Sequence, residues 1–227
     1  MSTPVQFTSG WCASDLGSYR PCEFTYEVYP LESLPVVDSA RLDGGFGWLG
    51  GPDAPDEQPS GHRDRLAAIQ AELAAIGLHL PEDFRTFYGS ERLCRGLDEV
   101  SVTACWSDVS DPLPSPAEDG ARLIRFLRDQ QDCVIWYLYL RPSGETFVVC
   151  SHLELESAYA EVGEEHLDAL RAAAAASLVR CATTFEEFAY RFVAENELWM
   201  HLNESNQDGT LAPHLQEYLD HYAAAAR

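Results

Sequence analysis

The stretch Arg122–Cys150 reads RLIRFLRDQQDCVIWYLYLRPSGETFVVC, and it decides the fold of this chain. Three segments of it, extended by one residue at the end, are rich in large apolar and aromatic residues: Arg122–Arg128, Cys133–Arg141 and Glu145–Ser151. Such segments are typical of β-strands, and connections this short permit only antiparallel pairing. The stretch therefore predicts three consecutive antiparallel strands joined by two tight turns.

The turn between the second and third segments sets their register. Residues 141–144, RPSG, fit a type I turn followed by a glycine in the left-handed region. This turn places Tyr139 opposite Phe147 and Tyr137 opposite Val149. The other face of the same two strands is nearly all apolar and is expected to point into the core; it carries Val134, Trp136, Leu138, Leu140, Thr146, Val148 and Cys150.

The face that carries Tyr137, Tyr139 and Arg141 is amphipathic and admits two interpretations. Either a helix covers it, which is the commoner arrangement for a strand tyrosine, or it meets a protein partner, since aromatic and arginine side chains dominate binding hot spots. The preceding turn, Asp129–Asp132, is polar and is expected to project into solvent. The candidate partner-binding residues are therefore Asp129, Gln130, Gln131, Asp132, Tyr137, Tyr139 and Arg141.

Helical patterns flank this sheet in the sequence. Apolar residues at steps of three and four predict a helix over His62–Ile76, with Gly77 as its stop signal. Pro81 opens a second, short helix, in which Phe84, Phe87 and Tyr88 are expected to face inward. An Ala-rich helix is predicted over 165–179 and a terminal helix over 211–226.

Thr184 and Glu187 form a capping box and begin another helix, whose apolar stripe includes Phe188 and Phe192. Alternating residues also predict strands over Glu23–Tyr29 and Glu99–Ser107. The fold class expected from these elements is α+β, an antiparallel sheet with helices packed mainly on one side. The side chains expected to be buried together are Phe126, Trp136, Leu138, Phe188 and Phe192.

The chain divides by composition into two parts. Residues 1–60 contain many Gly and Pro residues and one predicted strand, so they are expected to form an N-terminal extension. Residues 61–227 hold the remaining predicted elements and form the α+β domain, with helices at its C-terminal end.

The charge of the chain limits its partners. Asp and Glu number 37 against 15 basic residues, all of them Arg, which gives a net charge of −22. This charge repels phosphate and argues against nucleic acid as a partner. It favours a basic protein partner and would speed the encounter, although simple solubility is the commoner meaning of an acidic surface.

Neither targeting nor redox signals are evident. Met1–Gly10 has no basic start and no apolar run, and no segment is apolar enough to cross a membrane, so a cytoplasmic location is expected. The seven cysteines include no CxxC pair and are expected to be reduced core thiols.

The candidate chemical motifs are weak. Gly45–Gly50 satisfies GxGxxG, but Pro52 and Pro55 follow where a nucleotide-binding helix would have to begin. His214, Glu217 and His221 share one face of a predicted helix and could ligate a metal, although a solvated polar face is the commoner meaning of such a triple. No metal, cofactor or catalytic residue is therefore expected.

The order of these features resembles the SUKH superfamily, which includes the Smi/Knr-type cell-wall regulators and many bacterial immunity proteins. Three segments carry the resemblance, over about residues 62–202: AIGLHLPEDF at 75–84, IRFLRDQQDCVIW at 124–136 and TFEEF at 184–188. Gln130 and Gln131 stand where the family usually has a glycine pair, and the Asp-Pro pair of one subgroup is absent after the Trp136 strand.

The resemblance implies a non-enzymatic domain that binds proteins. Its bacterial members often neutralise a toxin encoded beside them by stoichiometric binding, and an acidic face would block a basic channel of the toxin. Two alternatives stay open from the residues alone. The chain could be a regulatory scaffold or adaptor on the same fold, or a hydrolase-type enzyme with a diffuse site that uses the histidines of the last helix.

Overall fold

The computed structural model describes residues 5–50, 58–161, 163–203 and 210–225. Its main feature is a sheet with the strand order β1-β9-β8-β7-β6-β4, in which β5 also pairs with β6. All neighbours are antiparallel except β1 and β9. The strands of this sheet are β1 (Thr8–Ser9), β4 (Trp106–Ser107), β5 (Leu113–Pro114), β6 (Arg122–Arg128), β7 (Ile135–Leu140), β8 (Thr146–Ser151) and β9 (Val179–Ala182).

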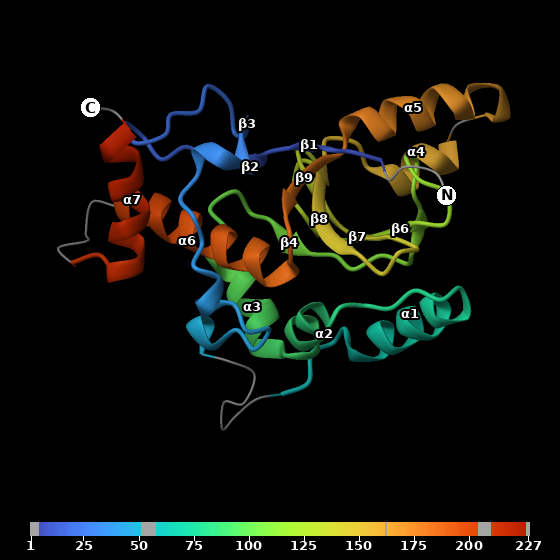
Figure 1. Ribbon diagram of the computed structural model, residues 1–227, viewed down its shortest axis with the longest axis horizontal. Helices are drawn as coiled ribbons and strands as arrows, with labels where there is room; N and C mark the ends of the chain where they lie inside the picture. The colour runs from blue at the N-terminus through green and yellow to red at the C-terminus, as the bar shows by residue number, and fades with distance from the viewer. Residues whose placement is uncertain (1–4, 51–57, 162, 204–209, 226–227) are drawn as a thin grey trace.

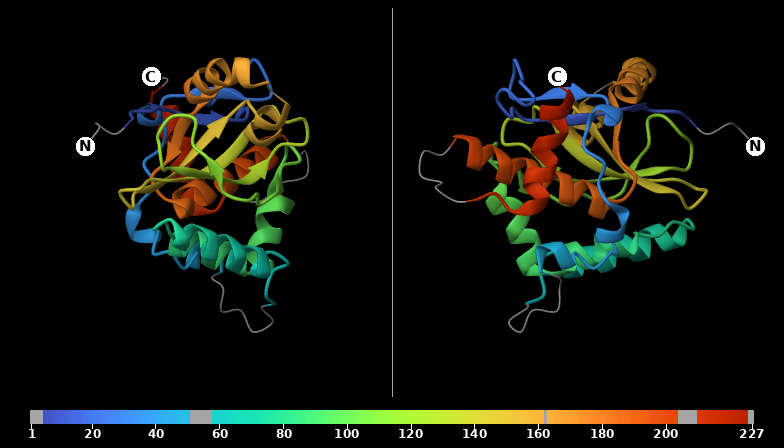
Figure 2. Two further views of the ribbon diagram at one scale, coloured as in Figure 1. Left: turned by 90° about the vertical axis from the view of Figure 1, so that its right-hand side faces the viewer. Right: turned by 60° about the vertical axis from the view of Figure 1, so that its left-hand side comes forward.

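Helices cover both faces of the sheet (Figures 1 and 2). One face packs against α1 (Arg63–Ala75), α2 (Glu82–Gly89), α3 (Glu91–Val100) and α6 (Phe185–Asn203). The other face packs against α4 (Leu155–Glu161) and α5 (Leu167–Ser177), and α7 (Pro213–Ala225) packs on the end of α6. The predicted α+β class with a mainly antiparallel sheet is confirmed.

The predicted hairpin register is confirmed. Tyr139 lies opposite Phe147, and Tyr137 lies opposite Val149. The amide of Arg141 donates to the carbonyl of Glu145 at 2.9 Å. Gly144 has φ +87°, which a residue with a side chain adopts only with strain.

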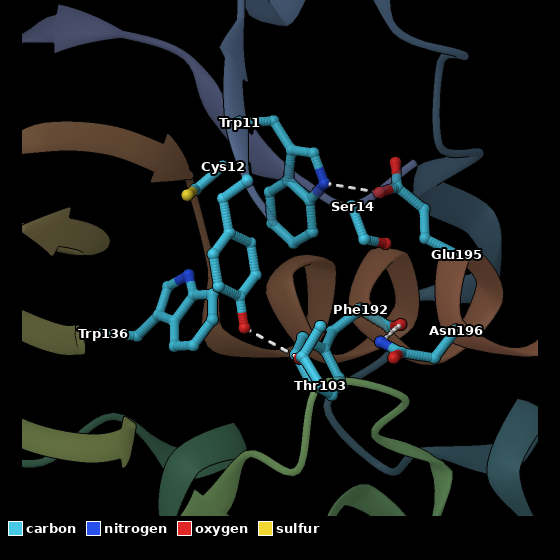
Figure 3. A pocket seen from close by; sticks show the side chains of 9 residues that line it. Trp11, Cys12, Ser14, Thr103, Trp136, Phe192, Glu195 and Asn196 are labelled. Carbon is cyan, nitrogen blue, oxygen red and sulfur yellow. Dashed lines mark hydrogen bonds between the residues drawn. The ribbon is translucent and has the colours of Figure 1, made fainter. Parts of the chain in front are cut away.

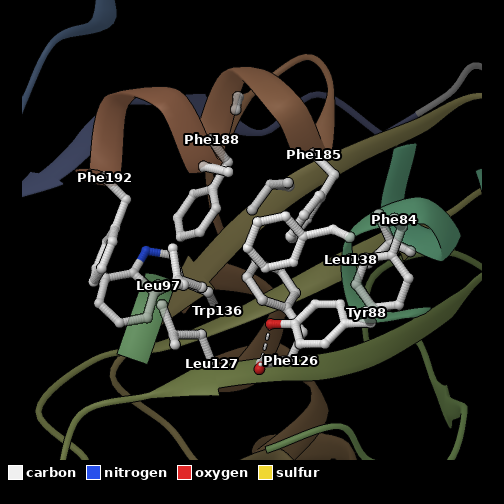
Figure 4. Close-up of a cluster of buried hydrophobic side chains, with 14 of the residues drawn as sticks. Phe84, Tyr88, Leu97, Phe126, Leu127, Trp136, Leu138, Phe185, Phe188 and Phe192 are labelled. Atoms are coloured by element: carbon white, nitrogen blue, oxygen red, sulfur yellow. Dashed lines mark hydrogen bonds between the residues drawn. The ribbon is translucent and has the colours of Figure 1, made fainter. Parts of the chain in front are cut away.

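Aromatic side chains fill the core between the sheet and α6, as Figure 4 shows. The ring of Phe126 on β6 lies 5.1 Å from that of Phe188, and the ring of Trp136 on β7 lies 5.8 Å from that of Phe192. Tyr88 of α2 donates its hydroxyl to the Phe126 carbonyl at 2.9 Å. The five side chains predicted to be buried together therefore belong to one core.

The helix boundaries follow the predicted signals. Gly77 has φ +78° just after α1, and Pro81 precedes α2. At the start of α6, Thr184 Oγ1 accepts a hydrogen bond from the amide of Glu187 at 3.1 Å. The Glu187 carboxylate accepts from the amide of Thr183 at 2.8 Å. In the usual capping box this carboxylate accepts from the amide of the N-cap residue itself, so here the reciprocal bond reaches one residue further upstream.

Two predicted elements are wrong in part. The strand predicted over Glu99–Ser107 is formed only at its last two residues, since α3 runs through Val100. Ser90 Oγ accepts from the Leu93 amide at 3.1 Å and caps that helix, and this local signal overrides the alternation that follows. The Ala-rich helix predicted over 165–179 ends at Ser177, and strand β9 begins at Val179.

The N-terminal segment shares the core of the sheet. Trp11 and Phe46 are fully buried in the same apolar cluster as Trp136, and β1 extends the sheet beyond β9. Of the strand predicted over Glu23–Tyr29, β3 (Glu27–Tyr29) forms, and it pairs with β2 (Trp11–Ala13) as a separate two-stranded ribbon. This segment is thus part of the domain rather than an appendage to it.

Buried polar side chains of α6 hold the N-terminal segment in place. The Glu195 carboxylate accepts from Arg20 Nη1 at 2.6 Å, from Trp11 Nε1 at 2.8 Å and from the Tyr218 hydroxyl at 2.6 Å. Arg191 Nη1 donates to the Pro35 carbonyl at 3.1 Å. These groups lie far from water, so their hydrogen bonds must be made within the protein. Glu195 and Arg191 of α6 make them with the N-terminal segment.

Candidate partner-binding surface

The polar turn between β6 and β7 is built around Asp129. This side chain is buried, and its Oδ1 accepts from the amides of Gln131 at 3.1 Å and Cys133 at 2.7 Å. The Asp129 amide donates to the Val134 carbonyl at 3.2 Å and closes the turn. Asp129 therefore shapes the turn and offers no surface to a partner, which corrects the expectation from sequence.

The other residues of the turn reach solvent. Gln130 and Gln131 are exposed, and their amide groups can both donate and accept hydrogen bonds. Asp132 is half-buried in the left-handed region, at φ 56°, and its Oδ1 accepts from Arg128 Nε at 2.7 Å. The predicted turn residues thus separate into one scaffold residue, two free contact residues and one carboxylate held by an ion pair.

An exposed aromatic residue lies beside this turn. Trp106 of β4 is 39% exposed at the edge of the sheet and pairs with Arg128 across the strands. The Arg128 guanidinium lies 5.5 Å from the centre of the indole ring, and hydrogen bonds from Arg128 to Asp132, together with Asp108, raise its pKa above the usual value. We define the turn surface as Trp106, Arg128, Gln130, Gln131 and Asp132.

Trp106 is a surface residue that the sequence does not reveal. It lies in the segment predicted as a strand over Glu99–Ser107, and nothing in the local pattern marks it as exposed. An indirect signal exists, because Arg and Trp side chains on paired strands often stack. Using it requires the pairing of β4 with β6, which the sequence does not predict.

The three strand residues among the predicted contacts are buried. Tyr137 and Tyr139 are fully covered, and α4 and α5 pack on their face. Tyr137 donates its hydroxyl to the Leu153 carbonyl at 3.1 Å, and burial raises the pKa of Tyr139 to about 12. Arg141 pairs with Glu118 at 2.9 Å. Tyr137 and Tyr139 belong to a second core, so the helix-covered interpretation is correct for them, and the burial of Arg141 likewise keeps it from a partner.

A small cavity lies between Trp11, Trp136 and the side chains of α6 (Figure 3). Its volume is about 10 Å³, which is room for about one water molecule. Trp11, Trp136 and Phe192 are among the residues that enclose it, and the Tyr26 hydroxyl at its side donates to Thr103 Oγ1 at 2.7 Å. No metabolite would fit, so the cavity belongs to the packing of the core.

Larger hollows open elsewhere on the described part of the molecule, including one of about 250 Å³ that Glu197 and His201 line and the two that follow. One of about 410 Å³ lies where α2 and α6 begin and is lined by hydroxyl and carboxylate groups, including Asp83, Thr184 and Glu186. Another of about 270 Å³ lies between β5, α4 and α5. Among the described residues that line either of these last two hollows there is neither a His nor a Cys, so neither presents a thiol or imidazole nucleophile with its base.

Three of the cysteines form a cluster, in which hydrogen bonds from Cys12 and Cys181 hold the pKa of the buried Cys150 thiol well below its usual value. None of the seven cysteines, all of which lie in the described ranges, forms a disulfide. Cys12, Cys150 and Cys181 contact one another, and Cys181 donates to the Val148 carbonyl at 3.5 Å. Burial raises the pKa of Cys181 well above its usual value, which keeps this thiol protonated and unreactive at neutral pH.

The histidines of α7 do not converge on a common point. His221 Nε2 lies 3.0 Å from the Ser33 carbonyl, and Glu217 is paired with Arg41 at 3.3 Å. Burial lowers the pKa of His214, whose ring lies 6.2 Å from that of Tyr190. Within the described ranges, no three His, Cys, Asp or Glu side chains are grouped to hold a metal ion.

The glycine-rich loop encloses a carboxylate of the protein itself. Glu186 Oε2 accepts from the Gly44 amide at 2.6 Å, and its Oε1 accepts from the Phe46 amide at 2.9 Å and from Trp48 Nε1 at 3.1 Å. These donors form the kind of anion-binding nest that holds phosphate in other proteins. Here Glu186 fills it, so the loop serves to attach the N-terminal segment to α6.

Comparisons with protein-family models, curated proteins and solved structures found no significant match to this chain. The similarity to the SUKH superfamily therefore remains an expectation drawn from three short motifs. Among the helices of residues 5–50, 58–161, 163–203 and 210–225, none combines the length and the apolar character that a bilayer crossing requires.

Proposed function

We propose that this chain is a non-enzymatic protein-binding domain that acts in the bacterial cytoplasm as an immunity protein, neutralising a basic toxin by stoichiometric binding. The observation that carries the proposal is the exposed Trp106 with Arg128 stacked on it, beside two free glutamine side chains. Tryptophan and arginine are the residue types most enriched at binding hot spots. A rigid turn presents them, so little ordering cost accompanies association.

The charge of the chain supports a basic partner. Most arginines in the described part of the chain are occupied by carboxylates or carbonyls, as Arg125 is by Asp108 at 3.0 Å and by Glu154 at 2.7 Å. The excess of carboxylates over arginines therefore acts as a net negative field. Such a field speeds association with a positively charged protein and weakens as salt is added.

The test begins with capture of a partner from the native host on the purified chain, followed by binding kinetics with the purified partner. The double variant Gln130→Arg/Gln131→Arg changes two exposed residues whose side chains leave the fold untouched. The control Ala71→Arg/Ala75→Arg adds the same charge at exposed positions of α1. We expect slower association for the first variant and little change for the control.

A rise in salt from 0.05 to 0.5 M should slow association of the wild type, since exposed charges are screened over about 10 Å at 0.1 M. Equal rate constants for both variants at every salt concentration would contradict the proposal. Adding this chain stepwise to the partner, while the partner's own activity is measured, distinguishes an immunity protein from an adaptor. An immunity protein abolishes that activity at one equivalent, whereas an adaptor leaves it intact.

A further inference from the structure

β2 and β3 form a ribbon that packs beside β9, and the loop that joins the two strands projects from the body of the molecule (Figure 1). We call residues 11–29 the hairpin lobe. Three of the large apolar side chains that the described structure leaves exposed belong to it: Tyr19 at 38%, Phe24 at 74% and Val28 at 51%. Phe24 is the most exposed of the three.

Buried contacts hold the hairpin lobe rigidly. Arg20 is almost completely buried and binds Glu195 of α6 through both arms of its guanidinium, Nη1 to Oε1 at 2.6 Å and Nη2 to Oε2 at 2.7 Å. The Leu16 amide donates to the Arg20 carbonyl at 2.9 Å, and the Cys22 amide donates to Asp15 Oδ1 at 3.0 Å. The lobe is therefore ordered before any partner arrives.

Burial of this ion pair costs free energy, and a loop that only connects two strands does not need it. Removing an arginine and a glutamate from water is unfavourable, and a pair of apolar residues would often stabilise the fold equally well. The ion pair does, however, fix one orientation of the loop, because two parallel hydrogen bonds are directional. Fixed orientation matters most for a loop that presents contact residues.

The exposed charge of the lobe has a single sign. Asp15, Glu23 and Glu27 are its acidic residues, and Glu32 follows soon after β3. Arg20 is the only basic residue in the range, and its charge is neutralised in the core. The lobe thus combines an apolar side chain with flanking carboxylates, which complements a partner surface that carries an apolar pocket among Lys or Arg residues.

The lobe adjoins the turn surface. Tyr26 donates its hydroxyl to Thr103 and lies 3.4 Å from Cys105 Sγ, next to Trp106 in the chain. The Tyr26 ring also lies 6.1 Å from that of Trp136, on the strand that follows the polar turn. The lobe and the turn surface are therefore neighbours, and one partner can contact both.

We propose that the hairpin lobe is the recognition element for a basic protein partner, with Phe24 as its apolar anchor and Glu23 and Glu27 as flanking contacts to Lys or Arg. This inference rests on the proposed function and extends it, because it identifies a second element of the interface and the chemistry that it reads. The residues concerned lie in the part of the chain for which the sequence predicted no role.

The test uses the full-length chain and the purified protein captured from the native host. Phe24→Ser removes the anchor, and since the side chain is largely exposed, the melting temperature should not change. The matched control is Ile76→Ser, at an apolar side chain that is 50% exposed at the end of α1. A third variant, Glu23→Arg/Glu27→Arg, reverses the flanking charge.

We expect Phe24→Ser to raise the dissociation constant about 30-fold or more, as the loss of an interface hot spot does. Ile76→Ser should leave it unchanged, and Glu23→Arg/Glu27→Arg should slow association and flatten its dependence on salt. Equal affinities for wild type, Phe24→Ser and Ile76→Ser would overturn this inference and leave the proposed function standing. Absence of any saturable one-to-one partner would overturn both.

Discussion

The centre of the sheet and the N-terminal segment both pack on α6 through apolar contacts, and the N-terminal segment adds buried polar contacts to them. Phe188 and Phe192 of α6 meet Phe126 and Trp136 of the sheet through apolar and aromatic contacts. Polar residues of the same helix, with Glu195 as the centre, hold the N-terminal segment through hydrogen bonds and an ion pair. One helix thus gives both regions an apolar support and gives the N-terminal segment a polar clamp as well.

The difference explains what each region can tolerate. An apolar contact is non-directional, so a core of this kind accepts changes of shape that conserve its volume. A buried ion pair is directional, and loss of one partner leaves the other charged and unpaired in the interior. The clamp should therefore respond sharply to single changes and mildly to replacement of both partners.

Truncation of Trp136 tests the apolar region. Trp136→Ala should lower the free energy of unfolding by about 3–5 kcal/mol, because it removes a large buried side chain and leaves a cavity. Urea denaturation monitored by circular dichroism measures the loss. An unchanged midpoint would mean that the sheet and α6 do not share the core described here.

Removal of Glu195 tests the polar clamp. Glu195→Ala should also cost about 3–5 kcal/mol, since Arg20 is then buried without its partner. The double variant Arg20→Met/Glu195→Met should recover much of that stability, because no charge is left in the interior. If the double variant lost as much free energy of unfolding as the two single variants together, the account of Arg20 and Glu195 as a directional clamp would be wrong.

Loss of the helix cap should have a smaller effect. Thr184→Ala removes the acceptor of the Glu187 amide at the start of α6 and should cost about 1 kcal/mol. Thr184→Ser keeps the hydroxyl and is the control. Because α6 supports both regions, thermal unfolding of the variant should remain a single transition, and two separate transitions would argue against a shared helix.

The smallest effect concerns an ion pair at the end of the β7–β8 hairpin. A hydrogen bond from Arg141 lowers the pKa of Glu145, so the folded state binds this proton less readily than the unfolded chain does. The resulting stability is present above the ordinary pKa of a glutamate and is lost as the pH falls through the lowered value. Glu145→Gln should therefore melt below the wild type at pH 7 and close to it at pH 3. A gap that stayed constant with pH would contradict the assignment.

The contrast between the apolar core and the polar clamp also explains which features the sequence could predict. The register of Tyr139 with Phe147, the start of α6 at Thr184 and the stop at Gly77 are local signals, and each was predicted. Arg20 and Glu195 are 175 residues apart in the chain, and no local pattern joins them. The clamp could not be derived for that reason.

The candidate site was predicted in part for the same reason. The polar turn was located correctly, because its sequence between two apolar strands is a local signal. The burial of Tyr137 and Tyr139 depends on where α4 and α5 cross the sheet, and the exposure of Trp106 depends on the pairing of β4. Both are long-range outcomes of the fold.

The central claim is that one partner binds the turn surface and the hairpin lobe together. Hydrogen–deuterium exchange of the full-length chain, alone and with the purified partner, tests it most directly. We predict slower exchange in peptides that cover residues 22–29 and 129–133, with α1 and α5 unchanged. Protection confined to α1, α5 or the hollow between β5 and α4, with no change at either predicted segment, would contradict the claim.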